Sequence, residues 1–218
     1  TVFSPDDRFV ACELKNGGKW SVALYDGSAE VHRSQAYPYT VYAPFFSPDG
    51  RLLVYVLGDE KTKIVSFLDV VTRKIVKETT YTDYSTGKFS FSSGSSRAVY
   101  SLDKEGKAFL VLIDFPRNEE RRVELPFALA GPASVSPDGR HILYTGAKEG
   151  KHYLVVSPWE TPERGKETGP YDTIVAPIFS PDSMTVACQA VKNSKWRSVV
   201  GEKEGAGYNF IGHADSSK

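Results

Sequence analysis

The chain has 218 residues, of which 40% are hydrophobic and 12% aromatic, and its 27 Lys and Arg residues balance its 27 Asp and Glu residues. This length and composition allow one large domain or two small ones with a real core, while the zero net charge argues against a nucleic-acid binder. No apolar run approaches the roughly 18 residues that a membrane-spanning helix needs, so membrane insertion is not expected.

The first predicted elements set a pattern that the rest of the chain repeats. The chain begins without Met and without a leader sequence, so we expect a processed form or a piece of a longer chain. A short apolar strand ends in Phe3-Ser4 and leads into the turn Ser4-Pro5-Asp6-Asp7. An alternating strand, the polar turn "NGGK" and a third strand, "WSVALYD", follow. Alternating apolar residues between Gly, Pro and Asp clusters are typical of β-strands.

The same pattern recurs about every 44 residues, which gives five copies. The third copy is degenerate, because "KFSFSSGSSRAVYSL" has Ser93-Gly94 where the others have Pro-Asp. Weaker fourth segments, such as "KIVKETTY" and "RRVELPF", close the copies. The remaining turns are Ser47-Pro48-Asp49-Gly50, Ser136-Pro137-Asp138-Gly139 and Ser180-Pro181-Asp182-Ser183.

Four short strands per copy at this period predict the blades of a β-propeller. We therefore predict an all-β fold, a single β-propeller domain over 1–218 with five four-stranded blades. A closed five-bladed ring is the first choice, and a fragment of a larger propeller is the second. The expected blades span approximately 1–43, 44–87, 88–131, 132–175 and 176–218.

The repeated turn is predicted to be structural. Ser suits its first position, Pro its second and Gly its fourth, so the motif favours a type I turn between antiparallel strands. The Ser hydroxyl is expected to accept from backbone N–H groups two or three residues on. No His lies at a fixed spacing from these serines, and a nucleophile is needed once rather than five times.

Other candidate site residues also favour a non-enzymatic protein without metal or cofactor. Cys12 and Cys188 occupy one repeat position, as do Trp20 and Trp196, so we expect buried free thiols rather than a disulfide. The inner strands contain no Asp or Glu, which argues against a glycoside hydrolase. The run "RNEERR" at 117–122 is interpreted as a solvated loop. The histidines show no metal-ligand spacing: His32, His141, His152 and His213.

The segments "PFFSPDGRLLVY", "PIFSPDSMTVAC" and "KWRSVVGEKEG" resemble the WD-like repeats of bacterial TolB-type β-propellers. The resemblance covers all five copies and is weakest in the third. It implies that the strand before each Ser-Pro-Asp turn is the innermost of its blade. It also implies a periplasmic or extracellular location.

Aromatic residues lie in the connections that lead from one copy to the next. In a propeller these connections gather around one end of the central channel, where aromatic rings can bind a peptide or a glycan. The alternative is that the rings fill space between blades. The candidate ligand-binding residues are Tyr39, Tyr84, Phe127, Tyr171 and Tyr208, and Tyr37 lies beside the first of them.

These observations predict a non-enzymatic interaction or scaffolding module that binds a protein partner. Two alternatives remain: a propeller that binds a glycan or another small ligand at its aromatic channel mouth, and the propeller domain of a larger enzyme such as a peptidase.

Overall fold

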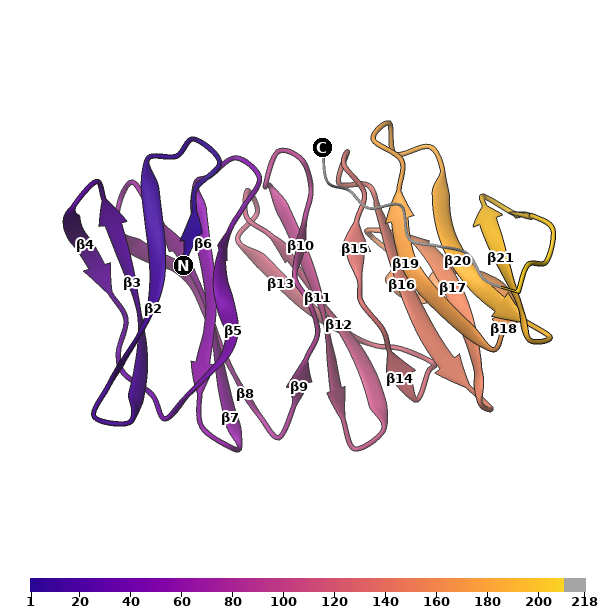
Figure 1. Cartoon of the computed structure of the whole chain (residues 1–218), viewed down its shortest axis with the longest axis horizontal. Coiled ribbons are helices and arrows are strands. Elements are labelled where there is room, and N and C mark those ends of the chain that lie inside the picture. The colour runs from indigo at the N-terminus through magenta and orange to yellow at the C-terminus, as the bar shows by residue number, and fades with distance from the viewer. Residues whose placement is uncertain (210–218) are drawn as a thin grey trace. The chain divides into compact units, whose positions relative to one another are not determined.

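The part of the chain that the structure describes consists almost wholly of β-strands and turns (Figure 1). The computed structural model describes residues 1–209, and their side chains except those of residues 40–42, 85–86 and 129–130. Within these residues the one helical segment is a 3-10 turn, η1 (Pro162–Arg164), and no helix is long and apolar enough to cross a membrane. The chain divides into two compact units, Thr1–Tyr84 and Ser85–Lys218.

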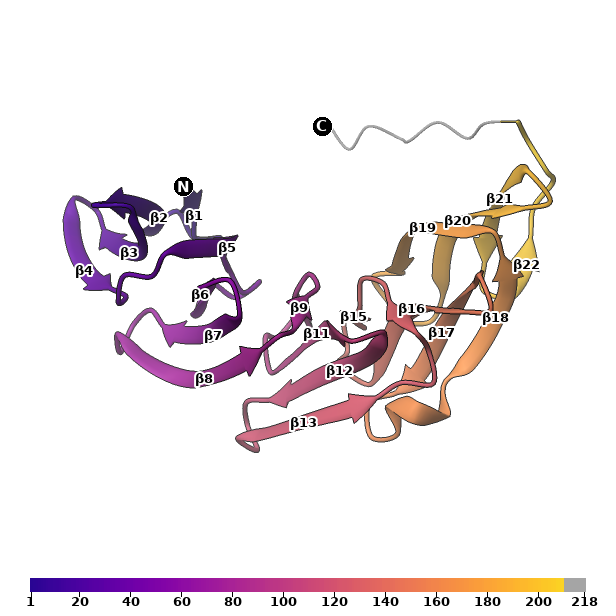
Figure 2. The same cartoon turned by 90° about the horizontal axis from the view of Figure 1, so that it is seen from below.

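The first unit contains two antiparallel sheets in which consecutive strands pair, and Figure 2 shows the two sheets packed side by side. Their strands are β1 (Val2–Phe3), β2 (Phe9–Asn16), β3 (Lys19–Asp26) and β4 (Ala29–Arg33), then β5 (Tyr39–Phe46), β6 (Leu52–Gly58), β7 (Thr62–Asp69) and β8 (Lys74–Thr82).

The second unit contains three more sheets of the same kind. The third sheet has β9 (Ser85–Thr86), β10 (Ser90–Phe91), β11 (Arg97–Lys104), β12 (Lys107–Asp114) and β13 (Glu119–Glu124). The fourth has β14 (Leu129–Ala130), β15 (Ser134–Val135), β16 (His141–Lys148), β17 (Lys151–Pro158) and β18 (Lys166–Tyr171). The fifth has β19 (Thr173–Phe179), β20 (Val186–Lys192), β21 (Lys195–Val200) and β22 (Lys203–Glu204).

The five sheets confirm the prediction of five propeller-type blades, with differences in their innermost strands. In the third and fourth sheets this strand is interrupted, so that β9 and β10 both pair with β11, and β14 and β15 both pair with β16. In the fourth sheet the interruption includes Pro132, which has no N–H to donate. From the second sheet on, the innermost strands begin three to five residues before the predicted boundaries, because residues such as Tyr39 already pair with the next strand.

Apolar side chains fill the spaces between neighbouring sheets of each unit. In the first unit Phe9 and Leu24 of the first sheet join Leu53 and Leu57 of the second in one buried cluster. In the second unit one cluster joins the third and fourth sheets and another joins the fourth and fifth. The sheets thus pack face to face, as propeller blades do.

Candidate functional site

The repeated Ser-Pro-Asp turn uses its own polar groups to hold itself together. In the second copy the Ser47 hydroxyl donates to Asp49 Oδ1 at 2.6 Å and accepts from the backbone N–H of Leu52 at 2.9 Å. The first, fourth and fifth copies make the same two bonds. The structural role predicted for the turn is confirmed. The expected acceptor pattern is wrong in one detail, because the hydroxyl accepts from an N–H five residues on.

The turns of the second unit also contact one another. The N–H of Ser93 donates to the carbonyl of Pro137 at 3.0 Å. The N–H of Asp138 donates to the Ser183 hydroxyl, also at 3.0 Å. The turn residues therefore tie adjacent sheets together, and none of these contacts resembles a catalytic arrangement of nucleophile and base.

The degenerate third copy keeps the turn but lacks its aspartate. The N–H of Ser95 still donates to the Ser92 carbonyl at 2.9 Å. The Ser92 hydroxyl now lies 3.4 Å from the Ser96 hydroxyl and accepts from the N–H of Arg97 at 3.2 Å. Ser96 occupies the position that Arg8 and Arg51 hold in the first two copies, so the arginine of this copy comes one residue later.

This shift places a guanidinium between the third and fourth sheets. Arg97 donates to Asp114 Oδ2 at 3.1 Å and to the carbonyl of Gly139 at 2.7 Å. The guanidinium also lies 4.8 Å from the ring centroid of the buried Trp159. The Arg97 side chain is 19% exposed and that of Asp114 is 8% exposed. The Asp114 carboxylate, the Gly139 carbonyl and the Trp159 ring together compensate the cost of removing this charge from water.

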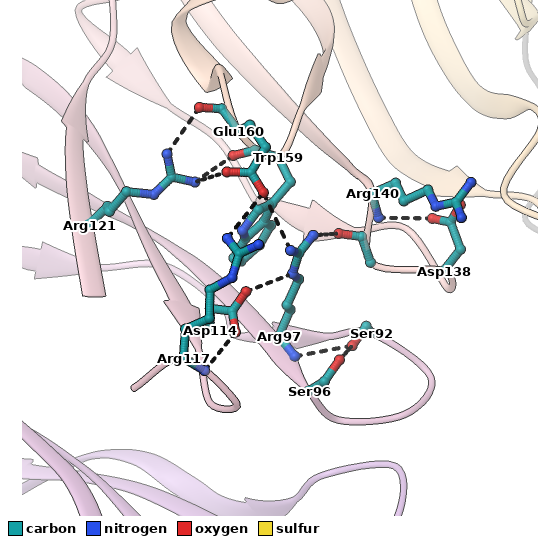
Figure 3. Close-up of polar contacts among 11 residues, drawn as sticks. Ser92, Ser96, Arg97, Asp114, Arg117, Arg121, Asp138, Arg140, Trp159 and Glu160 are labelled. Atoms are coloured by element: carbon teal, nitrogen blue, oxygen red, sulfur yellow. Dashed lines mark hydrogen bonds and ion pairs between the residues drawn. The ribbon is translucent and has the colours of Figure 1, made fainter. Parts of the chain in front are cut away.

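Two further arginines approach the same place, as Figure 3 shows. Arg121, on β13, donates to the carbonyls of Trp159 at 2.7 Å and Glu160 at 3.0 Å. The Glu160 carboxylate is 60% exposed and lies 3.5 Å from both Arg97 and Arg117. We call Arg97, Arg117, Arg121 and Glu160 the arginine latch, because it joins the third sheet to the loop after β17.

The arginine latch corrects the interpretation of residues 117–122 as a solvated loop. Arg121 reaches a segment 38 residues away, and no local pattern reports such a contact. One signal was visible in the sequence: the third strands of the first three copies all end in aspartate, namely Asp26, Asp69 and Asp114. Each of these carboxylates pairs with the arginine of its own turn.

The five candidate aromatic residues lie in different environments. Phe127 is buried between the third and fourth sheets, and Tyr171 is buried between the fourth and fifth. These two rings therefore do not share one surface. Tyr208 is exposed and its backbone pairs with Trp196 of β21. In the first unit Tyr39 is exposed, while Tyr84 is half-buried and packs edge-on against Tyr81, with 5.8 Å between ring centroids.

The cysteines and histidines form no metal site in the part of the chain that the structure describes. Cys12 on β2 and Cys188 on β20 are both free, on equivalent strands. Cys188 is buried, which raises the pKa of its thiol to about 11, whereas Cys12 is half-buried. His32, His141 and His152 lie on β4, β16 and β17, and His213 falls outside the described residues.

Taken by itself, the second unit exposes large apolar side chains on one face of its last sheet. Ile178 and Val200 stand on either side of Ala187 in the strand register, so all three share that face. Ile178 is 59% exposed and Val200 is 52% exposed. We call these three residues the apolar strip.

A cavity of about 320 Å³ lies near the other face of this sheet, toward the fourth sheet. Its apolar lining comes from Val156, Phe179, Met184 and Val186, and Met184 is itself exposed. Apolar surface is thus available on both faces of the last sheet.

Comparison with known proteins identifies the fold. No family model matches the chain, and no curated protein does. Among solved structures, TolB from Acinetobacter baumannii superposes with a TM-score of 0.56 and 16% identity over 89% of this chain and 50% of that one. Dihydro-heme d1 dehydrogenase NirN in complex with DHE gives a TM-score of 0.66 and 18% identity, covering 97% of this chain and 46% of that one.

The hydrazine synthase of Kuenenia stuttgartiensis gives a TM-score of 0.57 and 16% identity, covering 91% of this chain and 60% of that one. The chain therefore spans about half the length of the solved structures that it matches. At these identities the likeness concerns the fold alone. That fold is a TolB-like β-propeller with five antiparallel sheets.

Proposed function

We propose that the chain is a non-enzymatic propeller module that binds a protein partner through its last sheet. The apolar strip carries this proposal. Single exposed apolar residues are common, but neighbouring ones on one sheet face are typical of interaction surfaces. Ile178 and Val200 are each more than half exposed and are separated only by Ala187.

The other polar features of the chain are consistent with a binding role. The serines and aspartates of the repeated turn bond to each other, so these side chains serve to stabilise the turns. The guanidiniums of the arginine latch are paired with Glu160 and Asp114. Arginine and apolar anchors are common in protein interfaces, where a polar rim surrounds an apolar centre.

A photo-crosslinking experiment tests the proposal. A crosslinkable residue at Val200 in the wild-type background is expected to capture one defined protein from the native host. Replacing Ile178→Asp, with the crosslinker kept at Val200, should lower capture at least tenfold, because a charge in a desolvated interface is unfavourable. Val71→Asp is the matched control, since Val71 is 68% exposed in the first unit.

Two results would overturn the proposal. The first is capture that Ile178→Asp and Val71→Asp reduce equally. The second is a hydrolytic activity of the purified chain that disappears when residues at one end of the inner strands are changed.

A second candidate function is that of a propeller domain within a larger enzyme. It is supported by the named activities of two of the similar structures, a dehydrogenase and a synthase, of whose chains this one covers 46% and 60%. The sequence of the parent gene beyond residue 218 tests it. A neighbouring domain with a convergent catalytic set would favour it, and the lack of any such domain would count against it.

We also propose a periplasmic or extracellular location, on the strength of the TolB-like fold. Fractionation of the native host with an antibody against the chain tests this location. Recovery with cytoplasmic markers would contradict it.

A further inference from the structure

A groove opens in the first unit between its two sheets, on the side of their outer strands. Its volume is about 290 Å³, near the lower end of the range of roughly 300–1000 Å³ for small-molecule sites. Its walls come from β4 and the segment after it, and from β6, β7 and β8. The polar residues that line it are His32, Gln35, Tyr37, Tyr55, Ser66 and Glu78.

The second sheet supplies a row of hydrogen-bonding groups to this groove. Tyr55 and Glu78 both pair with Ser66 in the strand register, so the three side chains share one face. The Ser66 hydroxyl donates to Glu78 Oε2 at 2.7 Å. Tyr55 is buried, which raises the pKa of its phenol to about 12 and keeps it protonated at neutral pH.

The first sheet supplies a histidine whose ring nitrogen has no partner. His32 Nε2 is buried and makes no hydrogen bond with any protein group. His32 pairs with the buried Leu24, so its side chain is on the face that meets the second sheet. Burial lowers the pKa of the imidazole, which is therefore neutral at pH 7. Buried polar atoms in proteins nearly always have a partner. No bond at Nε2 holds the imidazole in this orientation, so a rotation of the ring can present a nitrogen to the groove that His32 lines.

The charges around the groove favour a neutral ligand. Arg33 is already paired with Glu30, to which it donates from Nε at 2.7 Å and from a second nitrogen. The Glu78 carboxylate disfavours an anion, and one of its two oxygens already accepts from Ser66. A ligand hydroxyl can donate to the remaining carboxylate oxygen and can either donate to or accept from an imidazole nitrogen.

We propose that the groove is a binding site for a neutral saccharide. Hydroxyl groups of a sugar ring pair with the imidazole of His32 and with Glu78, and the ring lies against the apolar edge formed by Tyr37 and Ile75. The Tyr37 hydroxyl donates to Gln35 at 3.0 Å, which fixes its ring in the groove wall. Ile75 is 39% exposed and offers the opposite apolar surface.

A titration of the whole chain, followed by nuclear magnetic resonance, tests the site. The probes are the methyl glycosides of glucose, galactose, mannose and N-acetylglucosamine, with glucuronate and glucosamine as charged counterparts. At least one neutral sugar should bind saturably, with a Kd on the order of 1 mM for a ligand of this size. Its resonance shifts should centre on His32 and Ser66, and the charged counterparts should bind more weakly.

Two variants and one control make the test decisive. His32→Ala and Glu78→Gln should each weaken binding at least tenfold, and Glu78 is exposed, so its variant should fold normally. His152→Ala, on β17 of the second unit, should leave binding unchanged. The proposal is overturned if no neutral sugar binds saturably, if the shifts centre elsewhere, or if both groove variants bind as well as the control.

Discussion

The internal bonding of the repeated turn predicts an unequal effect of the same substitution in two copies. Ser47 is fully buried, and its hydroxyl is the acceptor for the buried N–H of Leu52 at 2.9 Å. Ser47→Ala removes this acceptor and the donor to Asp49, while the bond from the N–H of Arg51 to Asp49 stays in place. A buried N–H left without a partner costs about 1–3 kcal/mol, so we expect a loss of about 2 kcal/mol in unfolding free energy.

Ser180→Ala provides the matched control, because Ser180 makes the same two bonds at 2.6 and 2.9 Å near the surface. Water can replace that hydroxyl, so the loss should stay within about 0.5 kcal/mol. Urea denaturation read by hydrogen exchange of β6 and β20 peptides measures the two units separately. Equal losses in both copies, or a larger loss at Ser180, would refute the reasoning.

Two further predictions concern the arginine latch and the decrease of the unfolding free energy at acidic pH. Arg97→Ala should destabilise the second unit by about 2–3 kcal/mol in thermal or urea unfolding, since it leaves the nearly buried Asp114 without its cation. Arg140→Ala, an exposed arginine in the neighbouring turn, should have little effect, and similar losses in both variants would contradict this. The hydrogen bond from the Ser136 hydroxyl holds the pKa of Asp138 below its ordinary value. The stability that this carboxylate contributes is therefore fully present above about pH 4, and it is lost as the pH falls through the pKa of the folded state. Ser136→Ala should raise that pKa in a carbon-detected titration, and an unchanged value would show that the bond is absent in solution.

The fold could be predicted because the turn that marks each repeat is formed by residues that are close together in the sequence. A Ser-Pro-Asp turn needs only five or six consecutive residues, so each copy reports its own geometry. The interrupted inner strands were less visible. Gly131 allows close approach to β16, where a Cβ would meet the Thr145 hydroxyl at 1.9 Å, and this neighbour is known only once the strands are paired.

The candidate sites depend on contacts between sheets, which a single sequence does not report. His32 becomes part of a groove only when β4 meets the second sheet. Arg121 contacts residues 38 and 39 positions away. The candidate aromatic residues illustrate the same limit. The sequence predicted one shared ligand-binding role for them, but the structure buries Phe127 and Tyr171 and exposes Tyr39 and Tyr208.

Comparison of equivalent positions separates the residues of the fold from those available for function. The turn serine is present in every copy and bonds its own backbone in every copy, so its role is structural. The fifth residue after it is Phe9 in the first copy and Leu52 in the second, but Arg97 in the third. The same position is His141 in the fourth copy and Thr185 in the fifth, so it varies from copy to copy. The first three copies share the arginine–aspartate pair, and what is particular to Arg97 is its contact with Trp159. By the same reasoning, features that occur once, such as the His32 groove and the apolar strip, are where binding is to be sought.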